Sequence, residues 1–550
     1  MKAVLAALLI AGPAAATTVV TNANGYTLTA AGALDHFSGL LIGDDGRVVR
    51  VLHAGDAVPP GTMLDAHGQT LLPGLIDAHG HVMELGFEAL SVDLNDTPSL
   101  AAALAKVRAY AAANPGAKWV VGGGWNQERW GLGRFPTAAE LDAAVPDRPV
   151  WLTRVDGHAG WANSRAIAAA GITAATADPA GGRIERGAGG VPAGVFVDSA
   201  RRLVAAKVPP PTAAEADRAL AKALEIMASV GLTGVGDAGT DRATWARYTA
   251  FAANGRLTTR VYALAAGMAE LAAIAPNGPI DWTAGDHIAL RGVKLYADGA
   301  LGSRGAWLKA PYSDDPANRG LQFLKGAALP DAVMLATNGG FQVAVHAIGD
   351  AANAQVLDAY AAVPAASRAR LRLRIEHAQI VDPADLPRFA ALSVIASMQP
   401  THATSDKGMA EARLGTDRLM GGYAWATLLG SGARFAGGSD FPVEPPNPMF
   451  GIHAAVTRQD RSGAPAGGWR PAERLTRLQA FAAFTTGAAF ANFAEARTGT
   501  LEPGKWADFI LVDRDIFTIP AADLWRVKVG ETWVGGRRVF SASPQSTVRR

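Results

Sequence analysis

The sequence predicts an α/β protein built on a (β/α)8 TIM-like barrel, with a small β-sandwich domain formed from both chain ends and an insertion after the first barrel strand. The middle of the chain alternates short apolar segments with alanine-rich helical runs, which is typical of a parallel sheet. The two chain ends consist of short strand-like segments separated by turn residues. At 550 residues, the chain is also too long for one simple core.

The first sixteen residues have the pattern of an export signal. Met1-Lys2 precedes an apolar run, and Gly12-Pro13 breaks that run. Residues 14–16 are all alanine and satisfy the small-x-small cleavage rule, which makes Thr17 the expected first mature residue. A buried N-terminal strand is the alternative. No other stretch approaches the length of a membrane span, so we expect a periplasmic or secreted protein with no membrane anchor after signal removal.

Residues 17–72 and 491–550 are expected to pair into one composite β-sandwich domain. The strand-like segments are 18–20, 26–28, 39–42 and 47–52 near the start, and 507–512, 527–529 and 531–534 near the end. Neither set contains enough strands to form a stable sheet comfortably by itself. Pairing the two ends solves this problem.

Residues 73–490 are expected to form the barrel. The eight predicted parallel strands are 75–79, 233–236, 259–264, 292–296, 341–346, 373–377, 394–398 and 434–440, with helical runs such as 216–229, 351–361 and 478–490. This alternation is typical of a (β/α)8 barrel. The connection after the first strand is too long for one helix, so residues from about 85 to 230 are interpreted as an inserted subdomain over the end of the barrel where active sites lie.

Residues of metal-ligand type gather at the ends of the predicted barrel strands. Positions i and i+2 of a strand point to the same face, so His79 and His81 can reach one point, and imidazole is a good ligand for zinc-class cations. The other candidates are Lys294, His346, His377 and Asp440. Each histidine alone has a plainer explanation as a satisfied core residue. Because parallel barrel strands end at one common mouth, their joint occurrence predicts a shared metal site.

Composition limits the possible functions and ligands. The formal net charge of +2 gives no electrostatic reason to expect nucleic acid or an anionic membrane as a partner. With no cysteine in the sequence, disulfides, thiolate metal ligands and a cysteine nucleophile are excluded together. We find no Gly-x-Ser-x-Gly elbow with a supported triad and no phosphate-binding Gly-x-x-x-x-Gly-Lys-Ser/Thr motif.

The chain resembles the amidohydrolase superfamily, and in particular its YtcJ-like branch (amidohydrolase family 3), over essentially the whole mature length. The matching segments are 73–81 (PGLIDAHGH), 293–305 (VKLYADGALGSRG), 345–350 (VHAIGD), 375–379 (IEHAQ), 438–442 (GSDFP) and 499–508 (GTLEPGKWAD). This set, in this order, is highly specific for the superfamily. It is not specific for a substrate.

The resemblance implies a binuclear centre that holds two divalent metal ions, most often zinc. By the family pattern, His79 and His81 hold the more buried ion together with Asp440, and His346 and His377 hold the second. Lys294 matches the position at which many members carry an N-carboxylated lysine that bridges both ions. The alternative for Lys294 is a charged barrel residue paired with a neighbour such as Asp298.

The resemblance also implies a hydrolytic mechanism. Two divalent ions would lower the pKa of a water molecule, and Asp440 would take its proton as general base and return it to the departing nitrogen as general acid. His158, in the segment 155–164, is the candidate for stabilising the oxyanion or for holding substrate. A structural loop histidine is the alternative for His158.

Three further residues are candidates for substrate binding. Trp125, in the predicted insertion, would shape the pocket together with Trp130 and Trp161, although a tryptophan is also a common core filler. Tyr296 and Arg304 belong to the motif of the fourth strand. Arg304 could pair with a substrate carboxylate or brace Asp298.

Three functions remain open. The first is a metal-dependent hydrolase of an amide-type C–N bond other than a peptide bond, such as an N-acyl or N-formyl amine. The second is a hydrolase of a cyclic amide, a lactone or other ester, or a dipeptide. The third, from another class, is a catalytically silent barrel that binds metal or another ligand. The expected partner is a small-molecule substrate, and a homodimer is kept as an alternative to a monomer.

Overall fold

The computed structural model describes residues 16–155 and 157–542, and the chain divides into two compact units. Unit 1 comprises Met1–Val82 and Leu224–Arg550, and unit 2 comprises Met83–Ala223. Residues 1–15 of the predicted export signal lie outside the described residues. Among the residues that are described, no helix is both long enough and apolar enough to cross a membrane.

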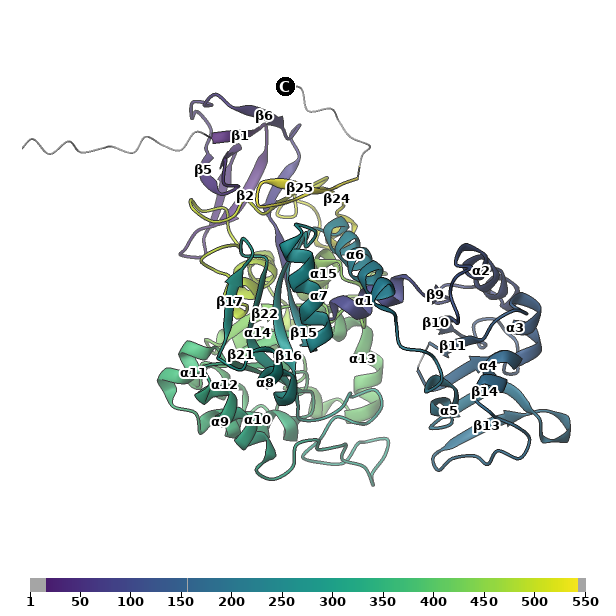
Figure 1. The fold of residues 1–550 in the computed structure, drawn as a ribbon. Coiled ribbons are helices and arrows are strands. Elements are labelled where there is room, and N and C mark those ends of the chain that lie inside the picture. Colours follow the sequence, from purple (N-terminus) through teal and green to yellow (C-terminus); the bar gives the residue numbers. More distant parts are fainter. Residues whose placement is uncertain (1–15, 156, 543–550) are drawn as a thin grey trace, which may run out of the picture. The chain divides into compact units, whose positions relative to one another are not determined.

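Unit 1 contains the predicted barrel (Figure 1). Its strands are β8 (Leu75–Gly80), β15 (Leu232–Thr240), β16 (Arg260–Ala266), β18 (Ile288–Tyr296), β19 (Gln342–Ala347), β20 (Arg374–His377), β21 (Ile395–Met398) and β22 (Arg434–Gly437). Neighbours in this order pair in parallel. Each strand overlaps one of the eight predicted segments.

The first and last barrel strands meet through the residues that follow β22. The backbone N–H of Asp440 donates to the carbonyl of His79 at 2.8 Å, and the backbone N–H of His81 donates to the carbonyl of Phe441 at 2.8 Å. The buried Asp77 carboxylate accepts a hydrogen bond from the Ser439 hydroxyl at 2.6 Å. The barrel is therefore nearly closed, and the predicted fold class is confirmed.

Helices accompany the barrel strands along the chain, and several of them are joined to the loops at the barrel mouth. They are α6 (Ala213–Ser229), α7 (Arg242–Ala253), α8 (Met268–Ile274), α9 (Ala328–Asn338), α10 (Asp350–Ala361), α11 (Ala365–Leu371), α12 (Leu386–Ala391), α13 (Pro400–Leu414), α14 (Trp425–Gly430), α15 (Pro448–Thr457), α16 (Arg477–Ala482) and α17 (Ala488–Ala491). A π turn over Ala483–Gly487 joins α16 to α17 inside the predicted helical run 478–490. Small and aliphatic side chains such as Ala78, Leu264 and Ala436 pack with α17 in the barrel core.

Both chain ends contribute to one pair of β-sheets in unit 1. One sheet has the order β25-β24-β23-β7-β2-β3 and the other β5-β4-β1-β6. Their strands are β1 (Ala16–Thr21), β2 (Asn24–Leu28), β3 (Leu34–Phe37), β4 (Gly39–Gly43), β5 (Val48–Leu52), β6 (Thr62–Asp65), β7 (Thr70–Pro73), β23 (Phe509–Val512), β24 (Val529–Val534) and β25 (Arg537–Ser541). β7 pairs antiparallel with β23, Phe509 lying opposite Pro73. Val20 and Leu40 from one sheet share a buried core with Leu71 and Phe509 from the other. Figure 1 shows the purple and yellow strands side by side.

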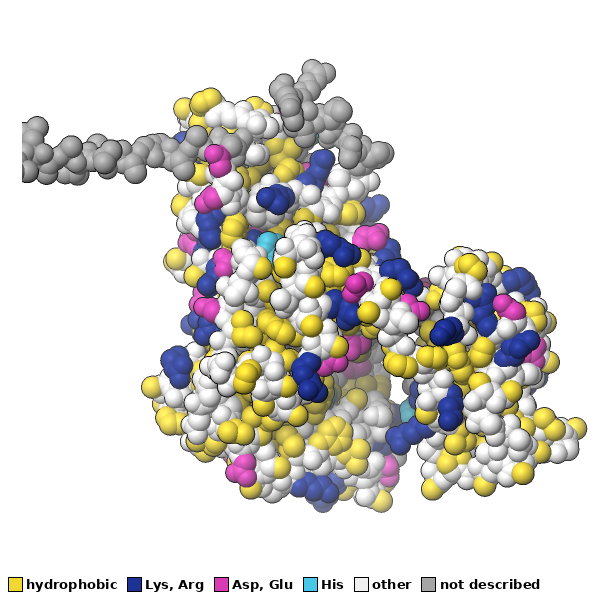
Figure 2. Space-filling model, in the orientation of Figure 1, with side chains coloured by type: hydrophobic (Ala, Val, Ile, Leu, Met, Phe, Trp, Pro, Cys, Tyr) yellow, Lys and Arg dark blue, Asp and Glu magenta, His cyan; other side chains and the backbone are white. Residues whose placement is uncertain are grey.

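Unit 2 has a mixed six-stranded sheet of its own, in the order β13-β14-β12-β11-β10-β9. Its elements are β9 (Val92–Asp93), β10 (Val120–Trp125), β11 (Val150–Arg154), β12 (Ala159–Ala162), β13 (Gly182–Arg186), β14 (Pro192–Asp198), α2 (Leu100–Ala113), α3 (Ala138–Ala144), α4 (Ser164–Ala169) and α5 (Arg201–Ala205). This unit corresponds to the predicted insertion after the first barrel strand. On the face drawn in Figure 2, basic and acidic side chains are interspersed over both units.

Candidate metal centre

The strand ends of the barrel bring the predicted ligand residues together around one cavity. Lys294 lies on β18, His346 on β19 and His377 at the end of β20, whereas Asp440 follows β22. These residues and His81 line a cavity of about 430 Å³. His79, near the end of β8, is fully buried beside them. The convergence expected of parallel barrel strands is thus present in the structure.

His79 is fixed in one orientation by a buried acid. Its Nδ1–H donates to Glu376 Oε2 at 2.5 Å, so Nε2 is left as an acceptor, 3.4 Å from Asp440 Oδ1. Glu376 is itself paired with the fully buried Arg374. Burial lowers the pKa of His79 to about 4, and the imidazole is therefore neutral near pH 7. A carboxylate that orients a histidine in this way is a common arrangement behind a metal ligand.

Asp440 faces histidines on both of its oxygens. Oδ1 accepts a hydrogen bond from His81 Nε2 at 3.0 Å, and Oδ2 lies 3.8 Å from His402 Nε2. Burial favours the protonated acid, but the hydrogen bond from His81 and the nearby histidines outweigh it and hold the pKa of Asp440 well below its usual range. Asp440 has a φ of +61°, an uncommon conformation for a residue other than glycine. This carboxylate is therefore held ionised at the centre of the site.

His377 is oriented by an amide instead of an acid. Its Nδ1–H donates to Gln399 Oε1 at 2.9 Å, which leaves Nε2 as an acceptor. Burial holds the pKa of His377 well below its usual range, and its φ is +73°. The ring of His377 lies 4.6 Å from the ring of His346, measured between centroids.

His346 and Lys294 complete the predicted set. His346 Nε2 is buried, lies 3.5 Å from Asp298 Oδ1, and has no hydrogen-bond partner among the described residues. Burial lowers the pKa of His346 to about 3 and that of Lys294 to about 8. Lys294 Nζ lies 3.1 Å from His79 Nε2.

The alternative pairing of Lys294 with Asp298 is wrong. The Asp298 carboxylate instead accepts hydrogen bonds from the backbone N–H groups of Trp307, Ile348 and Gly349 at 2.8, 3.0 and 2.8 Å. Three backbone donors satisfy its two oxygens, so Asp298 ties together the loops after β18 and β19.

His402 is a residue of the site that the sequence analysis missed. It lies in the first turn of α13, directly after β21, and lines the same cavity. The signal that could have found it is its place, four residues beyond the end of the seventh barrel strand.

The residues present fit a divalent cation. Two groups of three residues can each offer ligand atoms that all lie within 4.8 Å of one another. The groups are His79/His81/Asp440 and His377/His402/Asp440. The donors are imidazole nitrogens and a carboxylate, the set that zinc-class cations prefer. Such an ion would explain the buried, unpartnered Nε2 of His402, because a buried polar atom without a partner is otherwise unfavourable.

Tyr296 and Arg304, the predicted substrate-binding residues of unit 1, differ in their surroundings. Tyr296 lines the cavity, and the Lys294 ammonium lies 5.2 Å from its ring centroid. Arg304 forms a bidentate pair with Asp314 at 3.1 and 2.9 Å. The suggestion that Arg304 braces Asp298 is therefore wrong.

Trp125 and His158 belong to unit 2. Trp125 is fully buried in the unit's hydrophobic core with Trp161, and its indole N–H donates to the carbonyl of Leu152 at 2.8 Å. The alternative of a core tryptophan accounts for this position without a substrate. His158 is exposed, and its Nδ1 lies 2.8 Å from Asp198 Oδ1. Its role in catalysis or substrate binding stays a prediction.

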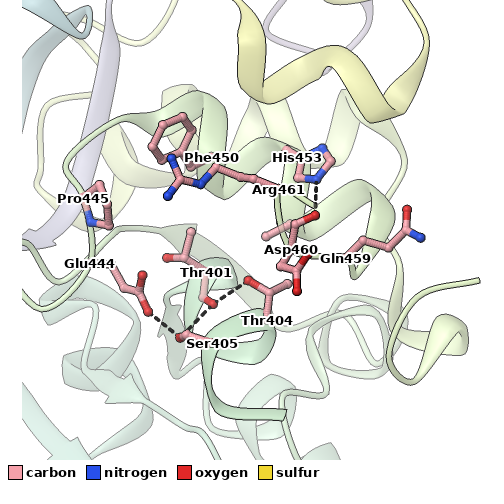
Figure 3. Close-up of a pocket in the computed structure, with 11 residues that line it drawn as sticks. Thr401, Thr404, Ser405, Glu444, Pro445, Phe450, His453, Gln459, Asp460 and Arg461 are labelled. Carbon is pink, nitrogen blue, oxygen red and sulfur yellow. Dashed lines mark hydrogen bonds between the residues drawn. The ribbon is translucent and has the colours of Figure 1, made fainter. Parts of the chain in front are cut away.

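A second, smaller cavity of about 160 Å³ shares Glu444 with the first (Figure 3). The hydroxyl of Ser405 donates to the Glu444 carboxylate, and the backbone carbonyl of Thr401 accepts from the hydroxyls of Thr404 and Ser405. α13 therefore has residues on both cavities, with His402 on the larger and Thr401 on the smaller.

Comparisons with known proteins agree with the barrel fold and identify the family. Residues 62–540 match the sequence profile of the amidohydrolase family (Amidohydro_3). The chain is 33% identical to the YtcJ protein of Bacillus subtilis over 87% of this chain and 90% of that protein. It is 30% identical to an N-substituted formamide deformylase of Arthrobacter pascens, over 88% and 90% of the two chains. The crystal structure of an uncharacterized metal-dependent hydrolase from Pyrococcus furiosus aligns with a TM-score of 0.74 and 28% identity, over 91% of this chain and all of that one.

Proposed function

The chain belongs to the amidohydrolase family, and on that basis we propose that it is an exported hydrolase that cleaves an amide-type C–N bond of a small molecule such as an N-acyl or N-formyl amine. The observation that carries this proposal is the position of Asp440, whose two oxygens face two separate groups of histidines. An ionised carboxylate at this point can accept a proton from a water molecule and return it to a departing nitrogen.

The histidines and Asp440 would hold the cations, and Asp440 would also move a proton. We propose that His79, His81 and Asp440 hold one zinc ion, and that His346 and His377 hold a second. Bound there, the two cations would supply Lewis acidity and lower the pKa of a water molecule. Asp440 would hold the transferred proton on a carboxylate oxygen, while Glu376 and Gln399 keep the two histidine rings in place.

Lys294 is proposed to be N-carboxylated. The Lys294 side chain is buried, and its Nζ lies 3.1 Å from His79 Nε2, the ring nitrogen that Glu376 leaves as an acceptor. Burial lowers the pKa of Lys294 to about 8, so a larger fraction of the neutral amine, the form that reacts with carbon dioxide, is present than at an exposed lysine. The carbamate would turn this residue into an oxygen ligand. A carbon-13 NMR signal from protein equilibrated with labelled bicarbonate, absent in Lys294→Met, would support this assignment.

The cavity supports a small substrate. A volume of about 430 Å³ is within the range of small-molecule sites. Leu301, Ile348, Met409 and Val443 provide apolar lining beyond the histidines. The N-substituted formamide deformylase of Arthrobacter pascens is a relative whose name describes removal of a formyl group from nitrogen, and this favours the N-formyl amines within the proposed class.

Export remains part of the proposal. It is supported by the sequence of residues 1–16, in which a lysine, an apolar run and an alanine triplet follow one another. N-terminal sequencing of the protein recovered from the periplasm or medium should begin at Thr17. Recovery of the uncleaved chain from the cytoplasm would contradict it.

The hydrolase proposal is tested with zinc-loaded protein and a panel of N-formyl amines, N-acyl amines, N-acyl amino acids, dipeptides and lactones. We expect turnover of the N-formyl or N-acyl amines. Asp440→Asn should lower kcat/KM by about 10²- to 10⁴-fold at saturating zinc, the usual contribution of a general base. Asp314→Asn, at the ion pair with Arg304, is the matched control. If turnover were confined to lactones or dipeptides, the proposed class of cleaved bond would be wrong. Full activity in Asp440→Asn would overturn the assignment of Asp440 as the general base.

A further inference from the structure

His402 lines the cavity, but none of the roles proposed above explains why a histidine lies there. Its α13 begins at Pro400, immediately after β21 and Gln399, so the first helical turn carries the imidazole to the barrel mouth. The ring is 9% exposed and lines the cavity with His377 and Asp440. A helix instead of a strand therefore places His402 beside His377 and Asp440.

The surroundings of His402 leave one of its ring nitrogens without a hydrogen bond. Its Nε2 is buried and has no hydrogen-bond partner among the described residues. Asp440 Oδ2 is 3.8 Å from Nε2, beyond hydrogen-bond length, and the rings of His377 and His402 are nearly parallel at 27° with centroids 6.0 Å apart. Ligands bound to one zinc-class ion at about 2.0–2.2 Å are separated by distances of this order.

The carboxylate of Asp440 links the two histidine groups. Oδ1 faces His79 and His81 at 3.4 and 3.0 Å, whereas Oδ2 faces His402. Two further acids, Asp406 and Glu444, line the same cavity and add negative charge near His402. A cation beside Oδ2 would therefore be favoured by charge and would satisfy the unpartnered ring nitrogen.

We propose that His402 is a further metal ligand, which holds a divalent cation together with His377 and Asp440. This inference rests on the proposed metal-dependent function, and it adds one imidazole to the ligands assigned to the second ion. The rival role is a hydrogen-bond donor to the substrate, in which case His402 would not contact the cation.

The absence of cysteine from the sequence permits a direct test. A thiolate ligand gives cobalt(II) a charge-transfer absorption band in the near ultraviolet, and the wild-type chain has no thiol to produce one. Cobalt-loaded His402→Cys should show this band. His287→Cys is the matched control, because His287 lies at the amino end of β18, opposite the strand ends that carry the ligands. The control should show no band.

A second variant keeps the test decisive if the cysteine variant does not fold. In His402→Gln, the affinity for one of the two ions should fall at least about tenfold, since even the loss of a group that only orients a ligand costs about 10- to 100-fold. Metal content is measured after equilibrium dialysis against zinc at fixed free concentration. Unchanged metal affinity in His402→Gln, or a folded, cobalt-loaded His402→Cys without the band, would overturn the proposal.

The spectroscopic result is separate from the hydrolase assignment. A charge-transfer band in a protein that hydrolyses nothing in the panel would sustain the ligand and reject the proposed function. Hydrolysis by wild-type protein with no band in His402→Cys would support the proposed function and reject His402 as a metal ligand.

Discussion

The chemistry of single residues in this site depends on how each histidine is held from behind. Glu376 accepts from His79 Nδ1, and Arg374 donates to Glu376, to the carbonyl of Ala78 at 2.7 Å and to the Ser397 hydroxyl at 2.8 Å. Burial alone would raise the pKa of Glu376, but Arg374 and His79 hold it well below its usual range. The acid therefore stays ionised where water does not reach it, and it fixes the tautomer that points Nε2 toward the cavity.

Glu376→Gln should weaken metal binding and destabilise the fold together. The amide lacks the charge that compensates Arg374, and removing one partner of a buried ion pair costs about 3–5 kcal/mol. Loss of the acid behind a histidine ligand should lower zinc affinity by about 10- to 100-fold. Calorimetric zinc titration and urea unfolding measure the two effects. Glu495→Gln, at the partly exposed pair with Arg372, is the control and should leave zinc affinity unchanged. Wild-type zinc affinity in Glu376→Gln would contradict the role of this acid.

Metal uptake should release a proton from His81 and not from His79 or His346. The pKa values of His79 and His346 are lowered by burial to about 4 and about 3, so both are neutral at pH 6. Burial lowers the pKa of His81, but its hydrogen bond to Asp440 and the charge of that acid outweigh burial and raise it above 6.5. At pH 6 a cation must therefore displace a proton from His81, and affinity should fall as the pH decreases below this pKa.

Zinc titrations at pH 6 in bicarbonate-free buffers of different protonation enthalpy measure the number of protons released. We expect wild-type protein to release about one proton more than His81→Gln. Equal release by the two proteins would show that another group carries the proton.

At the residue scale, the sequence predicted the cavity residues that lie on strands or follow them and missed the histidine on a helix. His79 and His81 were found because alternate strand residues share a face, and Asp440 because it closes a strand-like segment. His402 was missed because a histidine in the first turn of a helix has no such spacing rule. The Lys294–Asp298 and Arg304–Asp298 pairs were wrong because Asp298 is satisfied by backbone N–H groups, which a sequence does not reveal.

At the scale of elements, the apolar runs predicted all eight barrel strands, but they did not predict every strand end correctly. The predicted strand 434–440 ends at Gly437, because Asp440 leaves the extended conformation with a φ of +61°. The six strands of the sheet in unit 2 are harder to recognise in the sequence. β10 (VVGGGW) and β12 (AGWA) are rich in glycine and small residues, so they lack the alternation that predicts a strand.

Asp298 is the element-scale feature that holds the loops around the cavity. Its Oδ2 accepts from the backbone N–H groups of both Trp307 and Gly349. Asp298→Asn would place an amide NH₂ against these donors or against Ile348, whichever way the side chain turns. Each donor left unsatisfied costs about 1–3 kcal/mol. Thermal unfolding of the metal-free variant should therefore show a lower midpoint, with Asp331→Asn on the exposed first turn of α9 as control. An unchanged midpoint would show that these loops are held by other contacts.

At the scale of the molecule, a buried ion pair in unit 1 joins the C-terminal chain end to the barrel. Arg260, at the start of β16, donates to Asp508 through Nε at 2.7 Å and Nη2 at 3.0 Å, and both side chains are 3% exposed. Asp508 also accepts from the backbone N–H of Gly535, and its carbonyl accepts from Gly74 just before β8. The composite sheets therefore stabilise the strand that carries His79.

Asp508→Ala should destabilise the barrel more than the removal of both partners of the pair. The single variant leaves the Arg260 charge buried without its acid, which costs about 3–5 kcal/mol. In the double variant Arg260→Met/Asp508→Ala no buried charge remains, so the measured loss should be smaller than in Asp508→Ala, and the difference gives the coupling between the two residues. The exposed pair of Arg388 with Asp358 provides the control, for which Asp358→Ala should cost no more than about 1 kcal/mol. Urea unfolding of the metal-free proteins measures all three. If Asp508→Ala were no less stable than the double variant, the ion pair would not be what joins the C-terminal chain end to the barrel.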